Sequence, residues 1–314
     1  SVHRGNPMTM TLVVATRRSL LALTQTRAFV TQLMAANPGL DVTELHVTTT
    51  GDVIQDQPLA NIGGKGLFVK EIEQALIEGR ADFAVHSMKD MPPRLAEGLT
   101  LSAIPPREDA RDVAIGRSTL ELLPHGAKIG TSSLRRQVQI TALRPDLQCV
   151  PLRGNVDTRI RRCNEGVVDA ILLAAAGLAR LGWLDRVTQY LPTSLCLPAV
   201  GQGALAIESR SDDPLTRRVL ESMHDTETSC RVMAERGVQR AIGGNCEVPL
   251  GAHAERIDGN LLLRGMLADA HGGLWRSERS IPWPADERDA AHLGEEMGRY
   301  LLEKAQMGVL DCAP

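Results

Sequence analysis

The stretch TLVVATRRSLLALTQTRAFVTQLMAANPG, residues 11–39, contains the pattern that decides the fold. Its first part, Thr11–Thr16, is rich in β-branched and apolar residues and predicts a buried strand. Apolar residues then recur at helical spacing, so a helix is expected over Ser19–Ala35, ending at the Asn-Pro-Gly of 37–39. A strand followed directly by a helix is the unit of α/β folds, and further copies are expected along the chain.

Strands and helices go on alternating through most of the chain. Up to residue 105 we expect strands at Val42–Thr48 and Asp82–His86, with a helix at Leu67–Glu78 between them. After the proline pair at 105–106, helices should open near Ser133, Asn155 and Ala175, and the expected strands are Asp112–Gly116, Lys128–Gly130, Leu147–Leu152 and Asp169–Ala174. From about Thr226 a long helix, a glycine-rich loop, alternating strands and a last helix at Ala285–Gln306 predict a smaller α+β unit.

Composition and charge indicate an ordinary globular protein and argue against several function classes. Of the 314 residues 43% are hydrophobic and 23% are charged, and the longest apolar run, Ala170–Ala179, is far too short to span a membrane. The net charge of −3 and the low aromatic content of 3% disfavour a nucleic-acid binder. The six cysteines form no CxxC pair and the histidines form no HExxH motif, so no metal site is expected.

The first ten residues contain no apolar core followed by a small-residue cleavage site. Six cysteines without such a signal suggest reduced thiols, and we expect a cytoplasmic location. We also expect a monomer that has a small-molecule substrate and neither a membrane nor a nucleic-acid partner.

Positive charge is concentrated in one segment. Residues 131–162 carry seven arginines against two aspartates. Two clusters in it, GTSSLRR at 130–136 and RGNVDTR at 153–159, fall where a predicted strand is followed by a helix. The free N–H groups of such a helix start bind anions, and guanidinium and hydroxyl groups add donors. A ligand with several carboxylates or phosphates is therefore expected there, although arginines on helices are more often solvated and paired.

Two further stretches carry candidate catalytic groups. HSMKD at 86–90 ends a predicted strand, and the carboxyl ends of strands in open α/β sheets face the ligand crevice. Lys89 could there bind an anion and Asp90 could stabilise a cation, whereas the alternative is an ordinary surface turn. GGNCEVP at 243–249 puts Cys246 on a glycine-rich loop, where a thiolate is accessible, the alternative being an incidental loop thiol.

Two glycine-rich stretches do not qualify as nucleotide-binding motifs. GGKG at 63–66 lacks the first Gly and the final Ser or Thr of the P-loop pattern. GQGALA at 201–206 precedes a predicted strand, whereas a dinucleotide fingerprint precedes a helix. Both stretches are interpreted as places of hinge motion or close backbone approach.

Taken together, these motifs resemble the porphobilinogen deaminase family. The matching blocks are ATRRS (15–19), GGKGLFVKE (63–71), HSMKD (86–90), GTSSLRRQ (130–137), LRGNV (152–156), LAAAGLARLG (173–182), LPAVGQGA (197–204) and GGNCEVPLG (243–251). They occur in the family's order and extend from Thr11 to the C-terminal helix, and eight such blocks in register are hard to obtain by chance.

The resemblance implies an α/β fold of two domains similar to the halves of periplasmic binding proteins, with a smaller C-terminal α+β domain. The first domain would comprise residues 10–105 and 203–222, with the catalytic aspartate and a mobile loop. Residues 109–198 would form the second, arginine-rich domain, and residues 225–314 would form the third, with the cysteine loop.

The resemblance also implies the activity of hydroxymethylbilane synthase, a transferase of porphyrin and haem biosynthesis. Four porphobilinogen molecules would be joined head to tail, with release of ammonia, on a dipyrromethane cofactor that is itself attached to Cys246 by a thioether. Hydrolysis would then release hydroxymethylbilane. Each unit brings an acetate and a propionate, and guanidinium forks suit such carboxylates.

The family match assigns a role to each motif residue. Asp90, with Lys89 beside it, would be catalytic and would stabilise positive charge on pyrrole nitrogens. Cofactor and substrate would be bound by Arg17, Ser19, Lys65, Phe68, Ser87, Lys89, Thr131, Ser132, Ser133, Arg135, Arg136, Arg153, Gly154, Asn155, Arg159, Arg180 and Gln202.

Two other functions fit part of the same pattern. A two-lobed binding protein for polycarboxylate ligands would use the same arginines, but it has no need of a loop thiol or of Asp90. A thiol-dependent hydrolase acting through Cys246 would be blocked by alkylation and would carry no covalent pyrrole.

Overall fold

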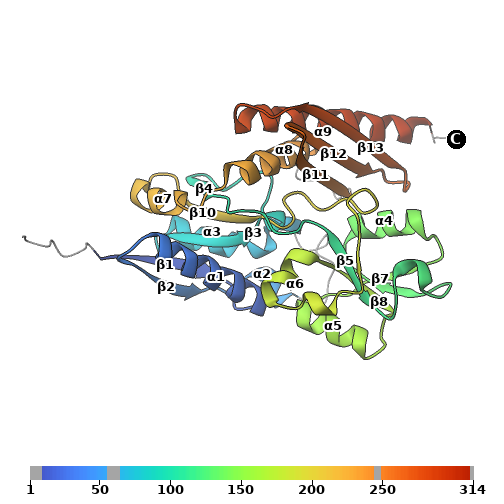
Figure 1. The fold of residues 1–314 in the computed structure, drawn as a ribbon, viewed down its shortest axis with the longest axis horizontal. Coiled ribbons are helices and arrows are strands. Elements are labelled where there is room, and N and C mark those ends of the chain that lie inside the picture. Colours follow the sequence, from blue (N-terminus) through green and yellow to red (C-terminus); the bar gives the residue numbers. More distant parts are fainter. Residues whose placement is uncertain (1–8, 55–63, 244–248, 312–314) are drawn as a thin grey trace, which may run out of the picture.

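Three β-sheets organise the part of the chain that the computed structural model describes, residues 9–54, 64–243 and 249–311 (Figure 1). The first sheet has, in spatial order, the strands β2 (Leu40–His46), β1 (Met10–Thr16), β3 (Phe83–Ser87), β10 (Leu205–Arg210) and β4 (Leu99–Ala103). β1 runs parallel to β2 and β3, whereas β10 is antiparallel to both of its neighbours. The helices of this unit are α1 (Leu20–Ala36), α2 (Thr50–Val53), α3 (Lys70–Ile77) and α7 (Pro214–Glu221).

The strand and helix expected at the start of the chain are confirmed. Leu12 and Val14 of β1 are buried against Phe29 and Leu33 of α1. The Phe29 ring meets the Phe83 ring edge-on, with centroids 6.2 Å apart, a favourable aromatic geometry. α1 begins after Ser19, whose hydroxyl accepts a hydrogen bond from the Ala22 amide.

The second sheet is built from one continuous part of the chain. Its strands, in spatial order, are β7 (Gln148–Val150), β6 (Lys128–Gly130), β8 (Ala170–Ala174), β5 (Asp112–Gly116) and β9 (Gln189–Tyr190). β6 is parallel to β7 and β8, and β5 is antiparallel to β8 and β9. The helices here are α4 (Leu134–Leu143), α5 (Val156–Asn164) and α6 (Ala175–Leu181).

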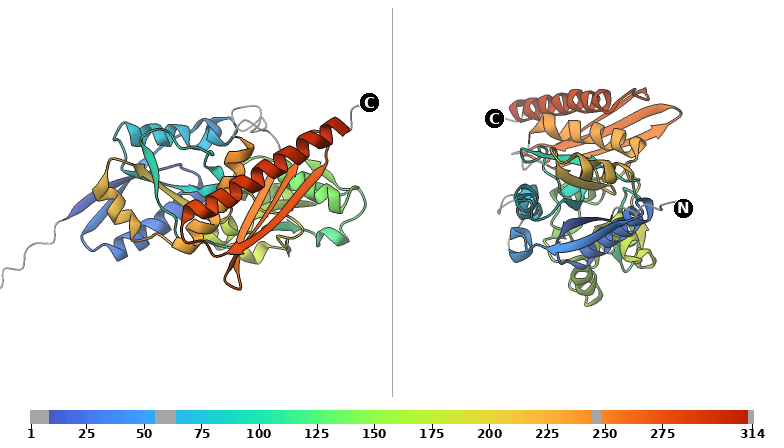
Figure 2. Two further views of the ribbon diagram at one scale, coloured as in Figure 1. Left: turned by 90° about the horizontal axis from the view of Figure 1, so that it is seen from above. Right: turned by 90° about the vertical axis from the view of Figure 1, so that its left-hand side faces the viewer.

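The third sheet is a meander that packs against two long helices. Its strands are β11 (Leu250–Ile257), β12 (Asn260–Ala268) and β13 (Leu274–Pro282), each antiparallel to the next. Helices α8 (Thr226–Ile242) and α9 (Glu287–Asp311) lie together along it (Figure 2). Their backbones approach closely because Gly298 lacks a side chain: a Cβ there would lie 2.6 Å from the Val238 carbonyl oxygen.

The chain crosses twice between the first and second sheets. It leaves after β4 and returns before β10, which lies between β3 and β4. Both crossings are fastened to α8 by Glu235, which is fully buried. Glu235 forms an ion pair with Arg107 at 2.7 Å and accepts a hydrogen bond from the Gly201 amide at 2.8 Å. The expected α/β class, with a third α+β unit, is confirmed by this topology.

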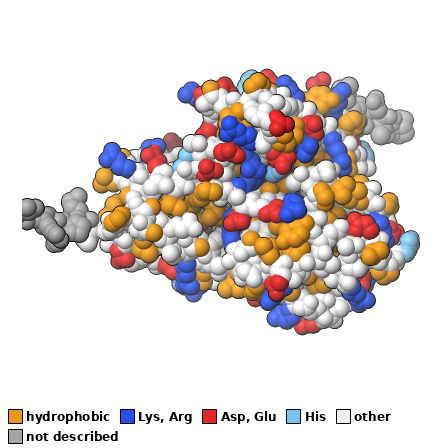
Figure 3. All heavy atoms as spheres, in the orientation of Figure 1, with side chains coloured by type: hydrophobic (Ala, Val, Ile, Leu, Met, Phe, Trp, Pro, Cys, Tyr) orange, Lys and Arg blue, Asp and Glu red, His pale blue; other side chains and the backbone are white. Residues whose placement is uncertain are grey.

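The surface offers no simple clue to function. On the face shown in Figure 3, acidic and basic side chains are interspersed. Within the described ranges, no helix has both the length and the apolar character needed to cross a membrane.

Candidate functional site

A cleft of about 340 Å³ lies between the first and second sheets and is lined from both. The carboxyl ends of the parallel strands β1 and β3 lie at one edge of the first sheet, and the segments after them form one wall. The starts of α4 and α5 form the other wall. The cleft brings together these expected site residues: Arg17, Ser19, Phe68, Ser87, Lys89, Asp90, Ser132, Ser133, Arg136, Arg153, Gly154, Asn155 and Arg159.

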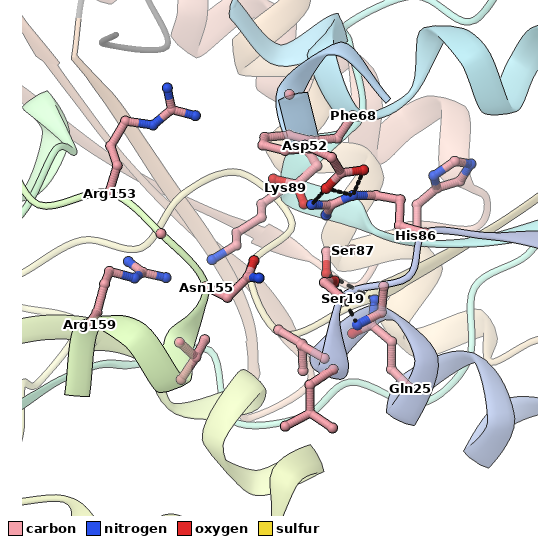
Figure 4. A pocket seen from close by; sticks show the side chains of 18 of the residues that line it. Ser19, Gln25, Asp52, Phe68, His86, Ser87, Lys89, Arg153, Asn155 and Arg159 are labelled. Carbon is pink, nitrogen blue, oxygen red and sulfur yellow. Dashed lines mark hydrogen bonds and ion pairs between the residues drawn. The ribbon is translucent and has the colours of Figure 1, made fainter. Parts of the chain in front are cut away.

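Lys89 and Asp90 reach the cleft because β3 ends in a single 3₁₀ turn, Met88–Asp90. Met88 is buried beneath that turn, and Lys89 points toward Asn155 and Arg159 of the opposite wall (Figure 4). Burial lowers the pKa of Lys89 to about 8, and the nearby Arg136 guanidinium adds to the effect. Lys89 is therefore a partly buried cation that faces the second sheet.

Arg17, after β1, is held by a carboxylate that local sequence patterns do not reveal. Its Nε donates to Asp52 Oδ1 at 3.0 Å, and its guanidinium lies 4.2 Å from the centre of the Phe68 ring. Asp52 also accepts hydrogen bonds from the amide and hydroxyl of Thr49, forming the cap of α2. Burial opposes ionisation of Asp52, but the bonds from Arg17 and Thr49 lower its pKa below the usual value.

The GTSSLRR stretch forms the start of α4. Ser133 caps the helix by accepting from the Arg136 amide at 3.3 Å, and its own amide donates to the Thr131 hydroxyl at 3.1 Å. Ser132 accepts from the Leu152 amide at 3.1 Å, which joins the stretch to the segment after β7. The hydroxyl groups thus shape this wall of the cleft.

Arg153, Asn155 and Arg159 come from the RGNVDTR stretch and face the cleft opposite Lys89 (Figure 4). Gly154 permits the turn between them, with a φ of +117°. Arg159 Nε is buried and has no hydrogen-bond partner among the described residues. Burial, followed by the charge of Arg136, lowers the pKa of Arg159 to about 10. This wall has more buried positive charge than its neighbours neutralise.

Arg135 is not among the cleft-lining residues, although Arg136 is. Consecutive helical residues point roughly 100° apart, so the two side chains cannot share one direction. Arg135 Nη1 donates to Asp112 Oδ2 at 2.6 Å and to the Leu197 carbonyl at 2.7 Å. Asp112 is fully buried and also accepts from Arg136 Nη2 at 2.9 Å. Arg135 therefore points away from the cleft, toward Asp112 and the Leu197 carbonyl, and its use as a carboxylate anchor stays a prediction.

Arg180 and Gln202 lie in a smaller cavity of about 90 Å³, which shares Ser87, Lys89, Arg136 and Arg159 with the cleft. Arg180 Nη2 donates to the Gly203 carbonyl at 2.9 Å. Gln202 is fully buried and donates to Asp112 Oδ1 at 2.9 Å, so it supports the arginine pair. Thr131 lines neither cavity.

Two expected site residues are not placed by the structure. Cys246 lies outside the described residues, and Lys65 belongs to the 3₁₀ helix Gly64–Phe68 without a described side chain. The cleft also contains Gln25, Asp52 and His86, which the sequence did not suggest as ligand-facing groups. Gln25 Nε2 donates to Ser87 Oγ at 3.3 Å, and its position in the middle of α1 gives no local signal of a site.

Comparison with known proteins assigns the chain to a family. Residues 12–218 match the model "Porphobilinogen deaminase, dipyromethane cofactor binding domain", and residues 229–303 match "Porphobilinogen deaminase, C-terminal domain". The porphobilinogen deaminase of Sorangium cellulosum is 52% identical, over 92% of this chain and 98% of the relative. That of Syntrophobacter fumaroxidans is 48% identical, over 95% and 96%.

Solved structures with a related fold include the methionine-binding protein MetQ, with 10% identity and a TM-score of 0.44 over 69% of this chain and 91% of that one. The two family models, by contrast, extend over most of the sequence. The chain belongs to the porphobilinogen deaminase family.

Proposed function

We propose that the cleft binds the carboxylates of the dipyrromethane cofactor and of the growing pyrrole chain, that Asp90 is the catalytic carboxylate, and that Cys246 is the attachment point. The observation that carries this proposal is the convergence of cationic side chains from both sheets on the cavity that Asp90 also lines. Lys89 and Arg17 come from the first sheet, and Arg136, Arg153 and Arg159 belong to the second.

Membership of the family fixes the reaction class. The chain is a transferase, a hydroxymethylbilane synthase of tetrapyrrole biosynthesis, which joins four porphobilinogen molecules with release of ammonia. When bound, the dipyrromethane supplies the pyrrole carbon from which the new chain grows. The product is then released by hydrolysis.

The residues of the cleft fit a ligand that carries several carboxylates. Arg159 Nε is buried without a partner among the described side chains and backbone groups. The pKa values of Lys89 and Arg159 are both lowered, by burial first and by the Arg136 charge second. A carboxylate placed between these groups would supply the missing acceptor and stabilise both charged forms. The cleft is therefore built for an anion with more than one carboxyl group.

Asp90 has a different task in this proposal. Positive charge develops on the substrate pyrrole as ammonia leaves, and a fixed carboxylate beside it stabilises that charge without rearranging. Lys89 and Arg136 hold substrate carboxylates, so that the reacting ring is oriented relative to Asp90. Ser19 and Ser87 add hydroxyl groups to the same wall.

The proposal also includes the domain limits, the cellular location, the oligomeric state and four further binding residues. We propose domain limits of 10–105 with 203–222, 109–198 and 225–314. The protein is proposed to act in the cytoplasm as a monomer, with Lys65 as a further ligand-binding residue, Phe68 lining the cleft, and Arg180 and Gln202 in the adjoining smaller cavity.

The proposal is tested by intact mass and turnover. The parent is expected to carry the mass of one dipyrromethane, and Cys246→Ser is expected to lack it. Asp90→Asn should keep the cofactor but lose turnover, whereas Asp185→Asn, an exposed aspartate outside the cleft, should behave as the parent. A loaded Cys246→Ser variant, or normal turnover by Asp90→Asn, would contradict the assigned roles. A parent that gains no pyrrole units even with porphobilinogen would overturn the cofactor assignment.

A further inference from the structure

A buried cluster of charged side chains lies behind the Lys89-Asp90 turn and is not used by the proposed reaction. It consists of Glu73 from α3, His86 from β3, Glu208 from β10 and Arg236 from α8. Their exposed fractions are 7%, 5%, 0% and 3%. Charged groups are seldom buried to this extent unless they have partners, so the contacts of the cluster need an explanation.

The strand register brings two members of the cluster together. Ala206 pairs with His86 and Glu208 pairs with Ala84, which puts His86 and Glu208 diagonally on one face of the first sheet. His86 Nε2 lies 3.0 Å from Glu208 Oε1. In Figure 4 the His86 ring points away from Lys89, toward the interior. The ring therefore connects the floor of the cleft to the buried carboxylate.

One member of the cluster, His86, belongs to the segment 86–96, which contains Lys89 and Asp90, and two other members contact this segment. His86 forms its beginning. Arg236 Nη2 donates to the carbonyl oxygens of Pro92 and Pro93, at 3.0 and 3.4 Å, directly after the turn. Glu73 Oε2 accepts from the Ala96 amide at 3.0 Å, at the end of the segment. The segment is thus held from behind at its start, its middle and its end.

Glu208 connects these contacts electrostatically. Its negative charge favours the charged form of the otherwise desolvated Arg236. Burial, followed by the Glu208 charge, raises the pKa of Glu73 to about 7. Among the described residues, neither Glu208 Oε2 nor Arg236 Nη1 has a hydrogen-bond partner. Removing the Glu208 charge would therefore act on His86 through their contact and on Arg236 through the lost negative charge.

We propose that Glu208, together with Glu73 and Arg236, positions the catalytic turn Met88–Asp90 for the reaction. These are positioning residues that act through the backbone of segment 86–96, and none of them lines the cleft. The inference rests on the proposed role of Asp90. A displacement of a catalytic group by about 1 Å can reduce the rate about 100-fold, so a support behind the turn has a measurable effect.

The test measures turnover per cofactor-loaded molecule in the full-length holoenzyme. Glu208→Gln keeps the size of the side chain and removes its charge, and Arg236→Gln removes both carbonyl contacts. For each we expect kcat to fall by about 10- to 100-fold while KM for porphobilinogen changes by less than about threefold. Arg236→Lys, which keeps the charge, should recover part of kcat. Glu78→Gln, on the exposed end of α3, is the matched control and should leave both constants unchanged.

The outcomes separate this inference from the proposed function. A purely structural role would reduce the loaded, folded fraction and leave kcat per loaded molecule within about twofold of the parent, and that result would overturn the inference. Should Glu208→Gln fail to fold, the Arg236→Gln and Arg236→Lys pair gives the same comparison. An unimpaired Asp90→Asn variant would refute the catalytic role of Asp90. A dead Asp90→Asn variant beside normal Glu208→Gln and Arg236→Gln variants would refute only the positioning role.

Discussion

Replacing Asp112 by asparagine is expected to destabilise the second sheet strongly. Asp112 is fully buried and accepts hydrogen bonds from Arg135 Nη1 at 2.6 Å, Arg136 Nη2 at 2.9 Å and Gln202 Nε2 at 2.9 Å. Asparagine keeps the shape but leaves two buried guanidinium groups without a counter-charge. Removing one partner of a buried ion pair costs about 3–5 kcal/mol, which corresponds to a fall in melting temperature of roughly 12–40 °C for a unit of about 90 residues.

The pH dependence of this effect follows from the pKa of Asp112. Burial opposes its ionisation, but the charges of Arg135 and Arg136 hold the pKa far below the usual value. A carboxyl with a depressed folded-state pKa contributes stability above its unfolded pKa of about 4 and loses it only as the pH falls through the folded value. The difference in melting temperature between parent and Asp112→Asn should therefore stay constant from about pH 5 to pH 8.

Thermal melts followed by circular dichroism measure the fall in melting temperature and its dependence on pH. Asp109→Asn is the matched control, because Asp109 forms a largely exposed ion pair with Arg111 at 2.7 Å, a type of pair that contributes at most about 1 kcal/mol. A melting temperature for Asp112→Asn within about 2 °C of the parent would refute the reasoning. So would a difference that varies strongly between pH 5 and 8, because it would mean that Asp112 titrates there.

Three further predictions concern protonation and backbone geometry. Since the pKa of Glu73 is raised to about 7, the folded state of the parent loses stability as the pH rises from about 4.5 through 7. The melting temperature of Glu73→Gln should therefore increase relative to that of the parent between pH 5 and pH 8. A difference that stays constant over this range would contradict the prediction. Because the pKa of Lys89 is lowered to about 8, KM for porphobilinogen should rise as the pH increases above 8, and Lys89→Arg should abolish that rise. Steady-state kinetics at several pH values measure this, and a KM of the parent that does not change with pH would contradict the prediction. Gly201→Ala should cost more unfolding free energy than Gly126→Ala, by denaturant titration: both have a φ of +74°, worth about 1–2 kcal/mol, but only at Gly201 would the Cβ lie 2.4 Å from Met88 Cγ. Equal losses for the two variants would contradict the packing argument.

Local sequence patterns were sufficient for most of the strands, for the starts of α4, α5 and α6 and for one wall of the site, but they did not predict β4 and β9. Ser133 could be recognised as the cap of α4 because a hydroxyl follows a short strand and precedes apolar residues at helical spacing. Asp90 could be placed at a strand end because HSMKD follows an apolar run. These features depend on residues close together in sequence.

Contacts between distant residues could not be predicted in the same way. Asp112 and Arg135 are separated by 23 positions, and the aspartate begins a strand whose other residues are apolar. The sequence around Arg135 does not distinguish it from Arg136. Only the orientation of α4 in the fold shows that Arg135 is bound by Asp112, whereas Arg136 also lines the cleft. Likewise Asp52 is 35 positions from Arg17, and Glu208 is 122 positions from His86.

The position of β10 in the first sheet has a consequence for synthesis of the protein. β10, residues 205–210, lies between β3 and β4, so the first sheet stays incomplete until that strand has left the ribosome. The second sheet uses only the continuous stretch from β5 to β9, which ends at Tyr190. Domains generally fold as units while the chain emerges. In this protein the second sheet, although it begins later in the sequence, is therefore the first that can be completed during synthesis. Until β10 is synthesised, the edge of β3 that pairs with it stays unpaired.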